Sequence, residues 1–309
     1  MKILPWMHWV GRFFVSLSLA FLGIGLWRQR IWLMGCQPSS IDIFLLLLAI
    51  VSYASSQFLL SYAWFRLLAL WSNTVPSKTD CHRIYGGTQI AKYLPGNFFH
   101  YVGRHLEGQK LGTGHPQLFV ASLLETIGVI FAAAFLSFVG FTLFYKNKLI
   151  INPVDILSLS ALSLIGIFVV LKLLPLVARR YALQLPNKKL DEVTPALLIA
   201  LICYIIFFLH AGLITLAATL RFDANLSLEH AGGVLTAFSV SWIVGFITPG
   251  SPGGIGIREA AFVTSLSSFI EERHALIIAI VMRLITSGGD VVFFLITKMH
   301  GNMQTRRMR

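Results

Sequence analysis

The stretch from Ala231 to Ala261, AGGVLTAFSVSWIVGFITPGSPGGIGIREAA, restricts the fold more than any other part of the chain. Its apolar content is that of a membrane helix, but two prolines and a series of glycines interrupt it. Proline removes a backbone donor and clashes with the preceding turn, so this composition is unfavourable for a continuous helix. We predict a helix that breaks at Pro249-Gly250 and a second helix that begins near Ile257. Such a break at membrane depth is tolerated where it is buried in protein or lines a polar cavity.

Composition places the rest of the chain in a membrane as well. Charged residues make up 12% of the 309 residues and hydrophobic residues 56%, whereas soluble domains carry about 25% charged residues. We therefore predict an all-α, polytopic membrane helix bundle that forms a single integral membrane domain over residues 1–309. The three cysteines lie far apart and have no metal or redox spacing, so we expect no metal and no cofactor.

Apolar runs long enough to cross a bilayer, about 20 residues each, give the expected spans. They lie at 13–27, 43–65, 117–145, 156–177, 193–220 and 275–297. The first resembles a signal sequence without a cleavage site, and we interpret it as a retained helix. With the interrupted region at 231–270, the total is about 6–8 transmembrane helices.

The distribution of basic residues predicts the orientation. The net charge of the chain is +12. In membrane proteins such an excess of basic residues usually lies in cytoplasmic loops, so we expect no nucleic-acid partner. Lys and Arg concentrate in 66–116, 172–194 and the C-terminal tail, which places these segments and both termini in the cytoplasm. Arg28 and Arg30 contradict this rule. The region 231–270 must then enter and leave on the outer face, as a re-entrant hairpin or as two short spans.

A second interrupted stretch lies at about 80–112. Its helical run from Arg83 ends at Pro95-Gly96, and a second run follows from Asn97, a good N-cap residue. Arg104 follows Pro95 by nine residues, as Arg258 follows Pro249. Two broken elements that enter from opposite faces form an inverted repeat; the alternative is coincidence among frequent glycines.

Charged and polar residues near the two breaks are the candidate binding residues. Gly253, Gly254 and Gly256 let the backbone approach a ligand closely, and Arg258 at the helix restart suits phosphate. Arg283 and Asp290 are seven residues apart, two helical turns, and share a face. Glu125 is either buried or extends to the interface. The expected substrate-binding residues are Lys92, Asn97, His100, Arg104, Glu125, Arg258, Glu259, Arg283 and Asp290.

The chain resembles a known family in the segments KYLPGNFFHYVGRHLEGQKLG, TPGSPGGIGIREAAF and RLITSGGD, together with Glu125. They are similar to the lysylphosphatidylglycerol synthase transmembrane domain family, which includes the flippase half of the multiple peptide resistance factor. The resemblance implies an integral protein of the bacterial cytoplasmic (inner) membrane that moves a lipid between leaflets. The resemblance implies functional roles for Lys92, Pro95, Gly96, Arg104, Glu125, Gly253, Gly254, Gly256, Glu259, Arg283 and Asp290. No soluble aminoacyl-transferase domain follows the last span, which puts lysyl-phosphatidylglycerol as substrate in doubt.

We therefore expect a lipid flippase or flippase-like transporter, not an enzyme, whose partner is a membrane phospholipid or a polyprenyl-phosphate-linked sugar. Four basic residues and four acids, including Glu107, lie near the breaks, and this balance fits an anionic or a zwitterionic headgroup. One alternative is a non-transporting accessory subunit of envelope assembly, with a glycosyltransferase partner. The other is a membrane-embedded transferase acting on lipid-linked sugar. The sequence lacks the Asp-x-Asp, His-x4-Asp and His-Glu-x-x-His motifs of such enzymes. The oligomeric state stays open.

Overall fold

The computed structural model describes residue 27 and residues 39–71, 76–93, 98–144, 190–222, 226–248 and 252–307. The predicted spans at 156–177 and, apart from residue 27, at 13–27 lie outside the described residues. So do Asn97 and the predicted break residues Pro95, Gly96, Pro249 and Gly250.

The described part of the chain is all-α and contains no strand, as predicted. Its elements in chain order are α3 (Ser40–Trp71), α4 (Lys78–Gln89), the 3-10 helix η1 (Ile90–Tyr93), α5 (Phe99–Lys110), α6 (His115–Phe144), α8 (Leu190–Leu220), α9 (Leu228–Ile247), the 3-10 helix η2 (Pro252–Gly254), α10 (Ile257–Leu266) and α11 (Glu272–Arg307). The segments Ser40–Leu70, His115–Gly140, Val193–Leu220, His230–Ile247 and Glu272–Met299 are long and apolar enough to cross a membrane. The predicted spans within the described residues are thereby confirmed.

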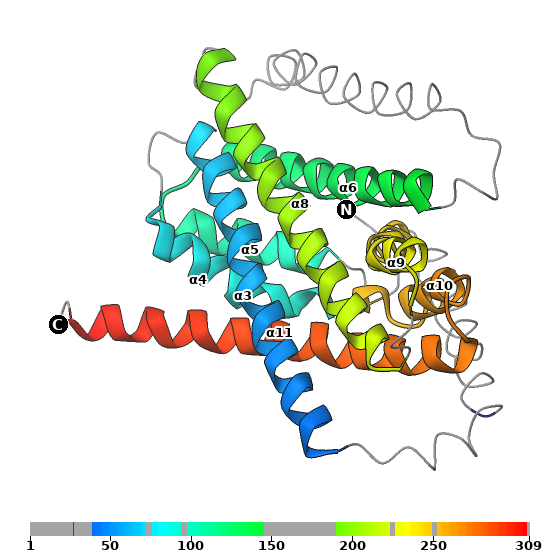
Figure 1. The fold of residues 1–309 in the computed structure, drawn as a ribbon. Helices are drawn as coiled ribbons and strands as arrows, with labels where there is room; N and C mark the ends of the chain where they lie inside the picture. Colours follow the sequence, from blue (N-terminus) through cyan, green and yellow to red (C-terminus); the bar gives the residue numbers. More distant parts are fainter. Residues whose placement is uncertain are drawn as a thin grey trace, which may run out of the picture.

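The long helices enclose the two interrupted elements. In Figure 1, α6 and α11 run across the molecule on opposite sides, and α3 and α8 pack side by side across both. The α4–η1–α5 segment and the α9–η2–α10 segment lie between α6 and α11. Each contacts both of these helices, and η1 contacts η2. The two interrupted elements therefore contact each other through η1 and η2, although the membrane face from which each one enters stays a prediction.

The first interrupted element begins earlier than predicted. Ser77 caps α4 by accepting a hydrogen bond from the Asp80 N–H at 3.1 Å, so the helix begins at Lys78 and not at Arg83. The last turn tightens into η1 and ends at Tyr93, and α5 begins at Phe99. The N-cap residue of α5 is Phe98, whose side chain makes no capping bond; the predicted cap residue Asn97 lies outside the described residues.

The second interrupted element changes direction through glycines. Helix α9 ends at Ile247, and Thr248 is extended (φ −74°, ψ 115°). Gly253, Gly254 and Gly256 have φ of 57°, 72° and 84°, a left-handed backbone that favours glycine. Helix α10 then begins at Ile257, as predicted.

Glycines also set the spacing of α11 against its neighbours. A Cβ on Gly289 would lie 2.6 Å from Tyr53 Cδ1 and 3.2 Å from the Ile50 carbonyl oxygen of α3. Only a residue without a side chain allows this approach. It brings the next residue, Asp290, within hydrogen-bonding distance of Gln57 on α3, 2.6 Å from Nε2 to Oδ1.

The double glycine of α4 offers a matched pair of substitutions. A Cβ on Gly86 would lie 2.2 Å from Thr297 Oγ1 on α11, whereas a Cβ on Gly87 has nothing within 4 Å. We expect Gly86→Ala to destabilise the fold by about 1–3 kcal/mol through overpacking. Gly87→Ala should be neutral, or stabilising by up to about 1 kcal/mol, because alanine loses less backbone entropy in a helix. Thermal unfolding in detergent micelles checks both; equal midpoints for the two variants would contradict the close α4–α11 packing.

Candidate functional site

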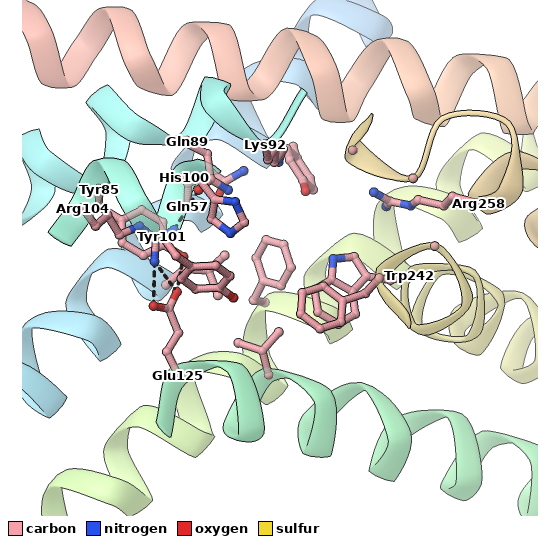
Figure 2. A pocket seen from close by; sticks show the side chains of 18 residues that line it. Gln57, Tyr85, Gln89, Lys92, His100, Tyr101, Arg104, Glu125, Trp242 and Arg258 are labelled. Atoms are coloured by element: carbon pink, nitrogen blue, oxygen red, sulfur yellow. Dashed lines mark hydrogen bonds and ion pairs between the residues drawn. The ribbon is translucent and has the colours of Figure 1, made fainter. Parts of the chain in front are cut away.

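A cavity lies where the two interrupted elements meet. Its volume is about 90 Å³. Its polar lining comes from five separate elements: Gln57 (α3), Gln89 (α4), Lys92 (η1), His100 and Arg104 (α5), and Glu125 (α6). Figure 2 shows Arg258 reaching in from the opposite side, near Trp242 of α9. The structure thus brings residues from both predicted breaks around one polar space.

Arg104 and Glu125 form a buried ion pair on one wall. Arg104 Nη1 lies 2.7 Å from Glu125 Oε1 and 2.6 Å from Oε2, and the two residues are 1% and 2% exposed. The Arg104 guanidinium stacks over the Tyr85 ring at 3.6 Å, and the Tyr85 hydroxyl donates to Glu125 Oε1 at 2.8 Å. Of the two alternatives for Glu125, the structure shows the buried one. Because the charge of Arg104 is paired with Glu125, Arg104 contributes to the polar wall of the cavity and is less available to bind a substrate anion.

Asp290 accepts hydrogen bonds from three side chains. Lys92 Nζ lies 2.7 Å from its Oδ2, the Tyr93 hydroxyl donates to the same oxygen at 2.6 Å, and Gln57 Nε2 donates to Oδ1. Asp290 is fully buried, so the three donors supply the stabilisation that water would otherwise give. Asp290 therefore joins α11 to η1 and to α3.

Arg283 makes the corresponding link from α11 to the second break. Its Nη1 lies 3.0 Å from Glu259 Oε1 and donates to the Gly253 carbonyl oxygen at 3.1 Å. Arg283 and Asp290 thus both contact the region of the breaks, as expected for residues on one face. Glu259 Oε2 also accepts from the Gly256 N–H at 2.6 Å. The anion position predicted at the start of α10 is therefore occupied in part by the protein's own carboxylate.

Arg258 differs from the other cations near the breaks. Its guanidinium lies over the Phe238 ring at 4.6 Å, and among the described residues no carboxylate forms an ion pair with it. It lines the main cavity and also a smaller one of about 20 Å³ beside Glu259 and Arg283. A partly buried guanidinium with no anion is a candidate ligand for a substrate anion.

His100 is a neutral polar group in the lining. Burial, with a contribution from the nearby positive charges of Arg104 and Lys92, lowers the pKa of His100 well below its usual range. The imidazole is therefore uncharged at neutral pH. It is 7% exposed, and its Nδ1 has no hydrogen-bond partner in the described part of the protein. His100 can donate to or accept from a ligand without adding charge.

The sequence analysis missed several residues that line the cavity, and one residue that it placed near the cavity, Glu107, lies elsewhere. Gln57 and Gln89, with the aromatic residues Tyr85, Tyr101 and Trp242, line the cavity but belong to no recognisable motif. Gln57 was the most accessible to prediction, because it is the single amide side chain within the span 43–65 and polar residues in spans mark functional positions. Glu107 is exposed and pairs with Lys110, so it does not belong to the cavity.

Comparisons with protein-family models, with curated proteins and with solved structures found no match. The resemblance to the lysylphosphatidylglycerol synthase transmembrane domain family therefore stays a prediction. The geometry of the cavity is the basis on which a function can be assigned.

Proposed function

We propose that this protein is a lipid flippase that moves a phosphate-containing lipid across the cytoplasmic membrane. The observation that carries the proposal is the cavity between the two interrupted elements, in which Arg258 is a cation without a carboxylate partner among the described residues. A charged headgroup is costly to place in hydrocarbon. A polar cavity inside a bundle of apolar helices lowers that cost, because it supplies fixed dipoles and charges in place of water.

The size of the cavity limits what can occupy it. Its volume is about 90 Å³, below the about 300–1,000 Å³ of pockets that enclose a drug-sized ligand, so only a small polar group such as part of a headgroup enters it. The cavity has no room for two acyl chains as well. The chains would stay in the surrounding lipid, beside helices that expose large apolar side chains such as Leu47 and Val51 of α3 and Leu198 and Ile202 of α8.

The bonds that join the two 3-10 helices to α11 indicate how the cavity would open. Asp290 and Arg283 hold η1 and η2 to the same helix, α11. Movement of either break relative to α11 would open the cavity toward one leaflet. Discontinuous helices at the substrate site are the usual arrangement in transporters that alternate between two open states.

The test is a scrambling assay in reconstituted liposomes. The purified protein should accelerate the exchange of acyl-chain-labelled phospholipid between leaflets, measured by chemical quenching of the outer leaflet. Arg258→Ala should slow the exchange about ten- to a hundredfold, since a hydrogen bond to a charged group contributes about 1.5–3 kcal/mol. Lys110→Ala removes an exposed cation that pairs with the exposed Glu107, and we expect it to behave as wild type.

A failure to accelerate lipid exchange would refute the proposal. The decisive result is exchange no faster than in empty liposomes, for glycerophospholipids and for a polyprenyl phosphate alike. Thermal unfolding of each variant in micelles separates a lost function from a lost fold.

A further inference from the structure

The charges around the cavity do not cancel. Lys92 pairs with Asp290, Arg104 with Glu125 and Arg283 with Glu259. Glu107, which would have balanced the count, pairs with Lys110 on the exposed surface. Among the described residues around the cavity this leaves one positive charge, that of Arg258, without a partner. The site is therefore complementary to a group with a single negative charge.

Neutral groups in the lining have unused hydrogen-bonding capacity. The Asp290 carboxylate can only accept a hydrogen bond, so the Gln57 amide must point its NH₂ group toward it. The amide oxygen, Oε1, therefore points away from Asp290. Gln57 is fully buried, and Oε1 has no hydrogen-bond partner in the described parts of the chain. His100 Nδ1, on a residue 7% exposed, is in the same situation. Buried polar atoms without partners are rare in native proteins. Both residues line the cavity but both atoms are covered, so a ligand would bind them where the lining moves aside.

The chemistry of that ligand follows from which polar and charged groups of the lining already have partners. Gln57 Oε1 needs a donor, which could be a hydroxyl or an ammonium group. An ammonium would add a second positive charge to the cavity. Every described carboxylate that contacts this region, Glu125, Glu259 and Asp290, is already paired with a cation. A hydroxyl satisfies the same acceptor without a charge to compensate.

We propose that the cavity binds a phosphodiester of a polyol, with one negative charge, free hydroxyl groups and no ammonium group. The phosphate oxygens would accept from the Arg258 guanidinium, and the hydroxyls would bind Gln57 and His100 on the far wall. Trp242, which stacks on Phe246 with ring centroids 4.9 Å apart, gives the wall near Arg258 an apolar surface for the carbon skeleton of the polyol. This inference rests on the proposed function, because it names the headgroup of the lipid that would move.

The direct test uses a matched pair of water-soluble headgroups. Glycerophosphoglycerol is a monoanion with a glycerol on each side of the phosphate, and glycerophosphoethanolamine keeps one glycerol and the phosphodiester but has an ammonium-bearing arm in place of the second glycerol. Calorimetric titration of the purified protein should show at least about tenfold tighter binding of the first, the difference expected for one hydrogen-bonded charge. Arg258→Gln should abolish the preference, and Arg258→Glu should reverse it. Lys110→Glu, the same reversal at an exposed position, should leave it unchanged.

A second arm distinguishes a lipid site from a site for soluble phosphodiesters. In vesicles with acyl-chain-labelled phosphatidylglycerol or phosphatidylethanolamine, the wild-type protein should exchange the first faster, and Arg258→Gln should remove the difference. If both lipids exchange at one rate and both headgroups bind equally, the inference is overturned while the flippase proposal stands. If neither lipid moves but the headgroup preference depends on Arg258, the site stands and the flippase proposal fails.

Discussion

Replacing Glu125 by leucine is expected to destabilise the fold by about 3–5 kcal/mol, the cost of leaving one partner of a buried ion pair uncompensated. Arg104 is 1% exposed, and its guanidinium lies against the Tyr85 ring, 3.6 Å from the ring centroid. The Tyr85 hydroxyl would also lose its acceptor, Glu125 Oε1. Chemical or thermal unfolding in detergent micelles measures the change.

The double variant Arg104→Met/Glu125→Leu tests whether the charge causes that loss. Removing both charges should restore most of the stability, since apolar replacements of a buried pair are often neutral or stabilising. The recovery should fall short by about 1–3 kcal/mol, because Gln89 Oε1 loses the donor Arg104 Nη2 at 3.0 Å. Glu107→Leu removes an exposed partner of Lys110 and should change stability by less than about 1 kcal/mol. Equal losses for the single and double variants would show that packing, and not charge, holds this wall together.

The positions of the helices and of their interruptions could be predicted from the sequence, because both depend on the local order of apolar residues, glycine and proline. Runs of apolar residues predict α3, α6 and α8 within a few residues at most ends. Glycine and proline predict the interruptions between Tyr93 and Phe99 and between Ile247 and Ile257. The main error in length is at α11, which continues to Arg307 beyond the apolar run that ends at 297. Lysine, methionine, glutamine and arginine form helices without being apolar, so the end of an apolar run does not mark the end of a helix.

The pairing of charges depends on tertiary structure and could not be predicted. Arg104 and Glu125 are 21 residues apart, and Lys92 and Asp290 lie far apart in the sequence, on η1 and α11. From sequence, four acids appear available to neutralise four bases. In the structure, Glu107 faces away, and that single difference turns a balanced site into one with a free positive charge.

Helix α11 holds both interrupted elements, so its ion pairs should control the stability of the whole site. Asp290→Asn keeps the shape of the side chain and removes its charge. The amide has one acceptor oxygen for three donors, and its NH₂ group would face Lys92, Tyr93 or Gln57. We expect a loss of about 2–4 kcal/mol, less than for Glu125, because the Lys92 side chain is 20% exposed and water screens part of its charge. Unfolding in micelles measures it.

Lys92→Met/Asp290→Asn distinguishes a charge effect from a packing effect at this position. With the lysine gone, the asparagine oxygen can accept from Tyr93 or Gln57, and we expect about half of the lost stability to return. If the double variant is no more stable than Asp290→Asn alone, Lys92 is not the source of the penalty. Because Lys92 and Asp290 leave together, the charge of the cavity stays at one positive unit on Arg258. The double variant should therefore keep the preference for an anionic headgroup even where its rate of lipid exchange changes, whereas Arg258→Gln should lose that preference in a fully stable protein.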